Sequence, residues 1–132
     1  MSATTYMRRC LELAEIAALA GDTAVGALIV CGDKVVGEGV ERIRAALDPS
    51  AHAEVEAIRQ GCHHLERLDL RGCSLYSTVE PCVLCGYVIR RTSIARVIEA
   101  NGRAVPPSAA SLLHVRPAAL SRLVPVRQRW MR

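Results

Sequence analysis

The chain has 132 residues, of which 51% are hydrophobic and 23% charged, and its formal net charge at pH 7 is +4. This balance is typical of a folded domain and excludes a disordered chain. No apolar run approaches the roughly 20 residues of a membrane span, and the N-terminus lacks a basic-then-apolar signal pattern. We therefore expect one domain over residues 1–132, with no membrane partner and no secretory leader.

The cysteines indicate metal binding rather than disulfides. Of the six cysteines, Cys82 and Cys85 form a Cys-x-x-Cys unit and the others are scattered. This usage favours a reducing compartment, and we expect a cytoplasmic protein. Cys10 and Cys31 are expected to be small buried apolar residues. The Cys62-His63-His64 run and Cys73 match no standard metal-binding spacing, so we expect no second site there.

The N-terminal part of the chain predicts a helix followed by a hairpin. Thr4–Ala20 has apolar residues at helical spacing, with Thr4 or Thr5 as its cap and Gly21 as its stop. Two runs rich in β-branched residues predict strands at Ala24–Val30 and Lys34–Val40. Residues 31–33 form the tight turn between them, so these strands are expected to pair in antiparallel fashion.

The middle of the chain predicts a helix and then a strand–helix–strand unit. After a loop over residues 42–48, Pro49 and Ser50 are expected to open a helix that runs to about Gln60 and ends at Gly61. The unit that follows consists of a strand, a helix and a strand at Ser74–Thr78, Pro81–Arg90 and Ala95–Ala100. Such a short crossover is right-handed and makes its two strands parallel.

The last third of the chain is less regular. Several prolines after residue 101 exclude a long helix, and we assign only a short strand near Leu123–Arg127. This region is basic, because residues 90–132 hold nine arginines against one acid, a net charge of +8. A basic tail attracts nucleic acid, but no stacking aromatics are interleaved, which favours a solvated surface or a subunit contact.

Three metal-ligating residues fall at the predicted starts of two helices. They are His52, Cys82 and Cys85, and one imidazole with two thiolates suits a tetrahedral zinc ion. Three protein ligands leave the fourth position for water, which is the arrangement of a catalytic zinc. The alternative is a structural zinc site, which normally needs a fourth protein ligand that this spacing does not provide.

Glu54 follows His52 by two residues and is the predicted proton carrier. Although i and i+2 side chains do not share a helix face, they converge on a point beyond the helix N-terminus. Glu54 can there take a proton from the attacking water and pass it to a leaving amino group. The alternative is an ordinary exposed glutamate. A His-x-Glu unit followed by Pro-Cys-x-x-Cys is the signature of zinc-dependent deaminases.

On these motifs the chain resembles the cytidine deaminase-like superfamily, in the branch of guanine deaminases, fungal cytosine deaminases and bacterial tRNA adenosine deaminases. The resemblance covers roughly residues 6–101. It implies an α/β, three-layer α/β/α fold with a mixed sheet of about five strands, and a homodimer. Leu84, Val88 and Ile89 are expected to pack either in the core or at the subunit interface, since relatives commonly dimerise through this region. The matching segments are Val25-Gly26-Ala27, a Gly37-Glu38-Gly39 turn, Asp48 to Glu54 and Pro81 to Cys85.

The resemblance also implies residues that contact substrate. The backbone at Ala27 is expected to line the pocket, and the backbone around Glu80 is expected to accept a hydrogen bond from the departing amino group. Trp130 is a candidate for stacking on the substrate ring, with a flexible tail or subunit contact as its alternative.

Glu41 departs from the family pattern. Relatives in this branch usually place an asparagine there, which both donates and accepts, whereas an ionised glutamate only accepts. We expect Glu41 to prefer substrate edges rich in N–H donors or cationic rings. The alternative is that Glu41 turns outward or pairs with Arg42 or Arg44.

The expected function is zinc-dependent hydrolytic deamination of a small heterocyclic amine that is guanine-, cytosine- or aminotriazine-like. The alternative is adenosine-to-inosine editing of tRNA, which the basic tail favours and which Glu41 and the late prolines, Pro117 and Pro125, disfavour. A non-catalytic zinc fold would not need Glu54. A pyrimidine deaminase of riboflavin synthesis usually carries a larger insertion or a fused reductase, which this chain lacks.

Overall fold

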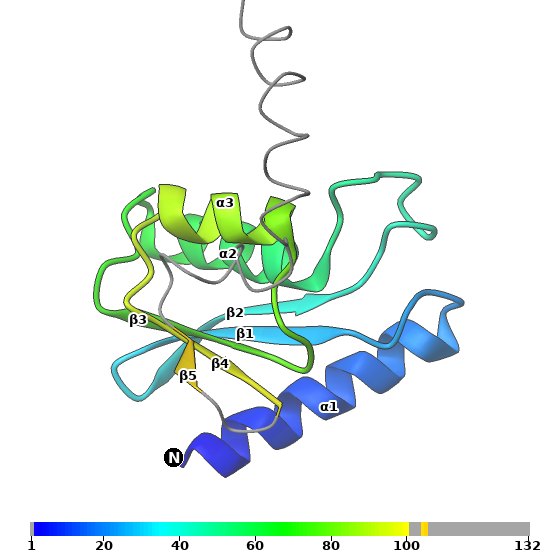
Figure 1. The fold of residues 1–132 in the computed structure, drawn as a ribbon, viewed down its shortest axis with the longest axis horizontal. Helices are drawn as coiled ribbons and strands as arrows, with labels where there is room; N and C mark the ends of the chain where they lie inside the picture. Colours follow the sequence, from blue (N-terminus) through cyan, green and yellow to red (C-terminus); the bar gives the residue numbers. More distant parts are fainter. Residues whose placement is uncertain (1, 101–103, 106–132) are drawn as a thin grey trace, which may run out of the picture.

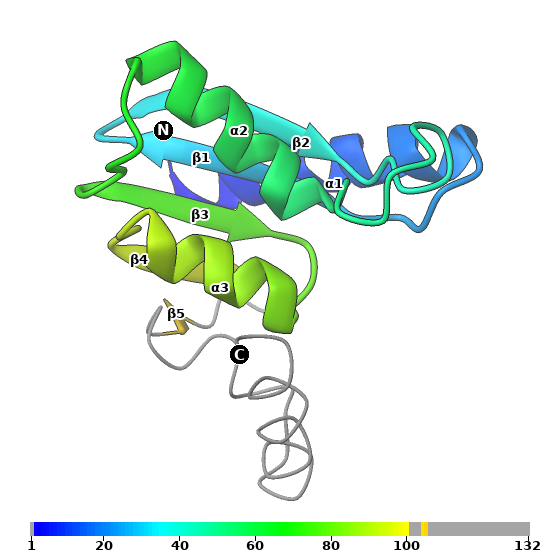
Figure 2. The same ribbon diagram turned by 90° about the horizontal axis from the view of Figure 1, so that it is seen from above.

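The structure, a computed structural model, describes residues 2–100 and 104–105. Its elements are α1 (Ala3–Leu19), β1 (Gly26–Cys31), β2 (Lys34–Val40), α2 (Ala53–Leu65), β3 (Cys73–Ser77), α3 (Val83–Arg91), β4 (Arg96–Glu99) and β5 (Ala104–Val105). Helix α1 covers one face of the sheet, and α2 and α3 lie side by side on the other (Figures 1 and 2). The expected three-layer α/β/α fold is confirmed. None of the described helices is long and apolar enough to cross a membrane.

The sheet is mixed and has the order β2-β1-β3-β4-β5. As expected, β1 and β2 pair antiparallel and β3 and β4 pair parallel. Strand β1 also pairs antiparallel with β3, so that Ala27 lies opposite both Gly39 and Ser77. Strand β5 was not predicted from the sequence, and it pairs antiparallel with β4. The strand expected at Leu123–Arg127 lies outside the described residues.

The two faces of the sheet bury separate cores. The α1 face holds seven buried residues, and the larger core lies on the α2 and α3 face. Helix α1 is capped by Ser2, whose hydroxyl accepts the Thr5 N–H at 3.3 Å, so the cap lies before the predicted Thr4 or Thr5. Gly21 follows with φ of +90°, in agreement with its predicted role as a stop.

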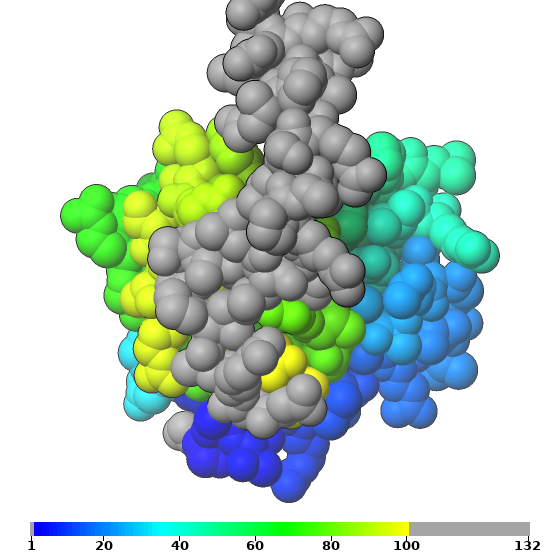
Figure 3. All heavy atoms as spheres, viewed as in Figure 1, coloured from blue at the N-terminus to red at the C-terminus, as the bar shows by residue number. Residues whose placement is uncertain are grey.

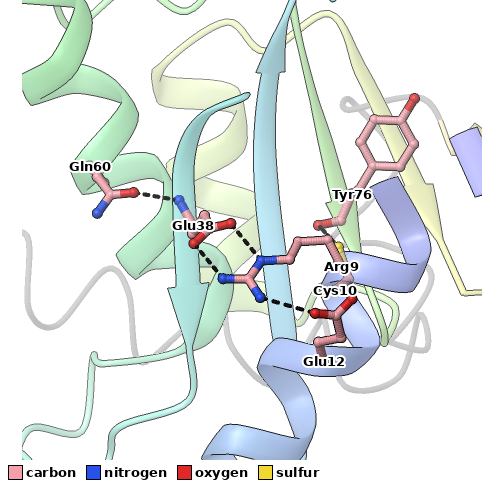
Figure 4. A network of polar contacts seen from close by, with 6 residues as sticks. All are labelled: Arg9, Cys10, Glu12, Glu38, Gln60 and Tyr76. Atoms are coloured by element: carbon pink, nitrogen blue, oxygen red, sulfur yellow. Dashed lines mark hydrogen bonds and ion pairs between the residues drawn. The ribbon is translucent and has the colours of Figure 1, made fainter. Parts of the chain in front are cut away.

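Glu38 connects both helical layers at the β2 edge (Figure 4). Its carboxylate accepts two hydrogen bonds from the Arg9 guanidinium of α1, at 2.8 and 3.0 Å. Its backbone N–H donates to the Gln60 side chain of α2. Because Arg9 and Glu38 are about two-fifths exposed, the ion pair contributes at most about 1 kcal/mol. Gln60 gives the Glu38 N–H of the edge strand a partner, which removes one donor from the exposed edge.

The two glycines of the Gly-x-Gly motif allow α2 to lie directly on β2. A Cβ added to Gly39 would lie 1.9 Å from the carbonyl oxygen of Ala53, and one added to Gly37 would lie 2.2 Å from that of Ala57. The motif is therefore not the turn that the resemblance implied, because both glycines lie within strand β2. They replace side chains with space for the helix backbone.

Three boundaries of α2 and α3 differ from the sequence predictions. Helix α2 begins at Ala53, not at Pro49, because Asp48 accepts hydrogen bonds from the N–H and hydroxyl of Ser50 and holds a turn there. It continues past Gly61, which packs on Ile29, and ends at Glu66 with φ of +54°. Helix α3 begins at Val83 rather than Pro81.

Gly39→Ala is expected to lower the free energy of unfolding by about 3 kcal/mol or more, because the new methyl group meets the backbone of α2. Gly61→Ala is the matched control. Its Cβ meets only the Ile29 side chain at 3.4 Å or more, so the helical alanine should stabilise by about 0.5–1 kcal/mol. Denaturant unfolding of both variants measures the difference, and equal effects would contradict the close-packing argument.

Candidate active site

The N-termini of α2 and α3 bring His52, Cys82 and Cys85 together. His52 is the N-cap residue of α2, and Cys82 is the N-cap residue of α3. The Cys82 Sγ lies 3.9 Å from His52 Nδ1 and 3.6 Å from Cys85 Sγ. The three candidate ligand atoms all lie within 4.8 Å of one another. One nitrogen and two sulfur donors at this separation fit a zinc ion.

The surroundings of the two thiols favour a negative charge. The hydrogen bond between the Cys82 and Cys85 side chains lowers the pKa of Cys82 to about 5, and backbone N–H groups and His52 act in the same direction. The pKa of Cys85 is raised, first by that same interaction with Cys82 and then by burial. Of the two thiols, Cys82 is therefore the one whose surroundings favour the thiolate form. The helix N-terminus adds a further preference for an anion.

Glu54 is the second residue of α2 and is only 3% exposed. Burial is the first cause that raises its pKa to about 7, and the charges of Glu41 and Cys82 raise it further. Its carboxylate lies within 4.8 Å of the ligand atoms of Glu41 and His52. The carboxyl group is thus close to the His52 ligand atom and can gain and lose a proton near neutral pH, as a general acid–base requires. The exposed-glutamate alternative is wrong.

Glu41 is buried and points toward α2. It is 8% exposed, and its Oε1 accepts the backbone N–H of Ala53 at 2.8 Å. Because His52 makes no side-chain cap, this carboxylate satisfies one of the free N–H groups at the start of α2. The alternative in which Glu41 turns outward or pairs with Arg42 or Arg44 is wrong.

The other three predicted site residues differ in what the structure says of them. Ala27 is fully buried on β1, opposite Gly39, which packs on the first residue of α2. Glu80 is half-buried, two residues before Cys82. Trp130 lies outside the described residues, so its place near the site stays a prediction.

Two further acids, Asp22 and Asp48, hold the loop that precedes His52 in place, and no role was predicted for them from the sequence. Asp22 is buried and accepts the backbone N–H groups of Arg44 and Ala45 at 2.8 and 3.2 Å. It ties the end of α1 to the loop of residues 41–52, which lies beside it (Figures 1 and 3). Asp48 holds the turn at Ser50. The sequences Gly-Asp after a helix and Asp-Pro-Ser both indicate turns, but they do not show which backbone N–H groups the aspartate side chains will bind.

The remaining cysteines form no second cluster among the described residues, where the candidate metal groups all contain His52. Cys10 is fully buried, as predicted, whereas Cys31 is only partly so. Cys62 and His63 lie within α2 instead of the predicted loop. Ile89 is buried and Val88 packs against the core, but Leu84 is exposed.

Known proteins match this site and its surroundings. The family model described as the cytidine and deoxycytidylate deaminase zinc-binding region matches residues 1–100, which include all three candidate ligands and Glu54. A tRNA-specific adenosine deaminase of Aquifex aeolicus is 36% identical over 93 residues, 70% of this chain and 62% of the relative. A guanine deaminase of Bacillus subtilis is 38% identical over 86 residues, 64% of this chain and 55% of the relative.

Solved structures agree with these relatives. The guanine deaminase structure from Bacillus subtilis has a TM-score of 0.73 at 36% identity and covers 76% of this chain and 64% of its own. A structure from a study of A-to-I editing by tRNA:A34 deaminases has a TM-score of 0.71 at 33% identity, covering 73% and 74%. The chain spans about six-tenths of the length of the curated relatives it matches. The protein belongs to the family that shares the cytidine and deoxycytidylate deaminase zinc-binding region.

Proposed function

We propose that the protein is a zinc-dependent hydrolytic deaminase that replaces the amino group of a small nitrogen heterocycle with oxygen. The observation that carries this proposal is the buried Glu54 carboxyl beside the His52, Cys82 and Cys85 ligand set. The three ligands would hold zinc, and a fourth coordination position would remain for water. A purely structural site gives no reason to bury a titratable carboxyl next to the metal.

The reaction consumes water and releases ammonia, with the exocyclic bond between the ring carbon and its amino nitrogen broken and a C–O bond formed at the same carbon. When bound, zinc lowers the pKa of a water molecule so that it attacks near neutral pH. Glu54 takes the proton from that water, delivers it to the neighbouring ring nitrogen, and then helps protonate the leaving amino group. The backbone near Glu80 would accept a hydrogen bond from that group, and Ala27 would line the pocket.

The guanine deaminase relatives and the acceptor-only Glu41 support a small-molecule substrate. A second candidate is adenosine editing in tRNA. Several curated relatives are tRNA-specific adenosine deaminases with comparable identity, and residues 90–132 carry a net charge of +8. A basic stretch of this kind favours a polyanionic partner. The two candidates share the chemistry at Glu54 and differ in what holds the base.

A homodimer is part of the proposal. Apolar side chains that follow β3 and begin α3 are 39–59% exposed, and these are Val79, Val83, Leu84 and Tyr87. Apolar residues gathered on one helix are commonly buried by a second subunit. Sedimentation at low concentration is the direct check, and a monomer at all concentrations would contradict this assignment.

Cys82→Ala is expected to remove the metal. Zinc bound by the purified protein, measured by elemental mass spectrometry, should fall from about one ion per chain to a small fraction of that. Cys62→Ala is the matched control, since Cys62 lies in α2 outside the cluster, and it should keep its zinc. Full zinc content in Cys82→Ala would contradict its role as a ligand.

Glu54→Gln is expected to stabilise the metal-free protein in a pH-dependent way. The folded carboxyl has a pKa of about 7 against an ordinary 4.5, so the unfolded chain loses this proton first and stability falls as pH rises from 4.5 to 7. The variant lacks this loss. The free energy of unfolding of the variant, relative to that of the parent, should therefore increase by about 2–3 kcal/mol from pH 4.5 to pH 7. Denaturant unfolding in the presence of a chelator measures this difference. A constant difference would contradict the raised pKa.

The function itself is tested by ammonia release from the zinc-loaded protein. The panel contains guanine, cytosine, adenine, their nucleosides, pterins, aminotriazines and a tRNA anticodon stem-loop. Turnover of a small heterocycle is expected, with at least a ~100-fold loss of rate in Glu54→Ala at unchanged zinc content. Turnover of the RNA alone would establish the second candidate instead. Undiminished turnover in Glu54→Ala would contradict the mechanism.

A further inference from the structure

Glu41 is held more rigidly than its position in a loop suggests. Its own N–H donates to the carbonyl of Val25 at 3.1 Å, and the next N–H, that of Arg42, donates to the carbonyl of Ala51 at 2.9 Å. The Glu41 backbone is therefore fixed to the start of β1 on one side and to the residue before His52 on the other. A side chain on such a backbone is preorganised, so it adds little ordering entropy when it binds a ligand.

One carboxylate oxygen of Glu41 is already used and the other remains available. Oε1 accepts the Ala53 N–H at the start of α2. Among residues 2–100, no donor pairs with Oε2, and no ion pair includes Glu41. Because Oε2 is not among the buried polar atoms that lack a partner, this oxygen reaches solvent beside His52 and Glu54, where a donor group of a ligand can meet it. The available acceptor lies where a substrate must bind if Glu54 is to reach it.

The charge of the site also favours ring edges that carry hydrogen-bond donors. A divalent zinc ion with two thiolates and a neutral imidazole would carry no net charge, so it would not offset the negative charge of the Glu41 carboxylate. This carboxylate lies within 4.8 Å of the Glu54 and His52 ligand atoms and repels any acceptor atom placed beside it. A ring edge with N–H donors, or a protonated ring, offsets this repulsion, whereas a ring carbonyl adds to it.

We propose, on the basis of the proposed deaminase function, that Glu41 is the specificity residue of the site and that its free oxygen accepts a hydrogen bond from a second donor group on the substrate ring. The substrate class is then a diamino or otherwise donor-rich ring, in which one amino group leaves and another N–H binds Glu41. A ring with a carbonyl in place of that second donor binds poorly.

Two pairs of compounds test this preference, since the members of each pair carry either an amino group or the oxo group of a lactam, with its ring N–H, one ring atom away from the carbon that bears the reacting amine. The pairs are 2,6-diaminopurine with isoguanine, and 2,4-diaminopyrimidine with cytosine. The zinc-loaded protein is expected to favour the amino member of the pair it accepts by about 10-fold or more in kcat/KM, which corresponds to one hydrogen bond to a charged group. Dissociation constants from calorimetry should show the same order.

Glu41→Gln is the decisive variant. Its amide oxygen can keep the bond to the Ala53 N–H, while its NH2 group replaces the free acceptor with a donor. The amino-to-oxo preference should fall at least about 10-fold or reverse, with zinc content and melting temperature retained. Glu15→Gln is the control, because Glu15 is exposed on α1 and loses the same charge far from the site. Its preference should match that of the parent.

The outcomes separate this proposal from the function on which it rests. Turnover in the parent with an unchanged preference in Glu41→Gln would overturn the role of Glu41 and leave the deaminase standing. Loss of zinc in Glu41→Gln would make Glu41 a metal ligand and also overturn it. If the parent releases no ammonia, the deaminase proposal fails, and the binding preferences still decide whether Glu41 selects donor-rich rings. A parent that binds neither member of either pair would contradict the proposed selection.

Discussion

The close approach of α2 to β2 is the constraint on which the site depends. Because Gly37 and Gly39 have no Cβ, the helix backbone lies against the strand at Ala53 and Ala57. This contact fixes the distance between the first turn of α2 and strand β2, and it therefore also fixes the positions of His52 and Glu54. A side chain at Gly39 would move the carbonyl of Ala53 and therefore the start of the helix. The glycine pair is thus part of the site although neither residue performs chemistry.

The second requirement is that two helices begin at the same place. Strand β3 and the short segment after it deliver Cys82 to the N-terminus of α3, next to His52 at the N-terminus of α2. Neither N-cap residue makes a side-chain cap, since their side chains are turned to one another instead. The free N–H groups and the two helix dipoles favour thiolate and carboxylate at this point. The helices give up local capping and gain a site suited to anionic ligands and a metal.

The acidic groups of the same site destabilise the fold. Glu54 is almost fully buried with a raised pKa, and Glu41 lies close to it with a like charge. Removal of the Glu54 carboxyl should relieve this cost, which is characteristic of a residue kept for function rather than for folding. The stabilising contacts lie elsewhere, in the two apolar cores and in the Asp22 hydrogen bonds that hold the loop before His52.

Local chemistry explains which features could be predicted from the sequence. The hairpin, the parallel pair and the convergence of His52, Cys82 and Cys85 follow from periodicity and ligand spacing. The start of α2 could not be placed, because the Asp48 side chain competes for the N–H groups that Pro49 and Ser50 would give a helix. Nor could the Glu41–Ala53 bond, which joins residues twelve positions apart through tertiary packing. Strand β5 has too few residues to form a pattern.

In the proposed site, one imidazole and two thiolates hold zinc and leave a position for water. X-ray absorption of the zinc-loaded protein tests it most directly. We expect two sulfur ligands at about 2.3 Å and two nitrogen or oxygen ligands near 2.0–2.1 Å. In the Cys82→Ala variant, the zinc signal should be absent. A shell of four sulfur ligands, or one without sulfur, would contradict the account.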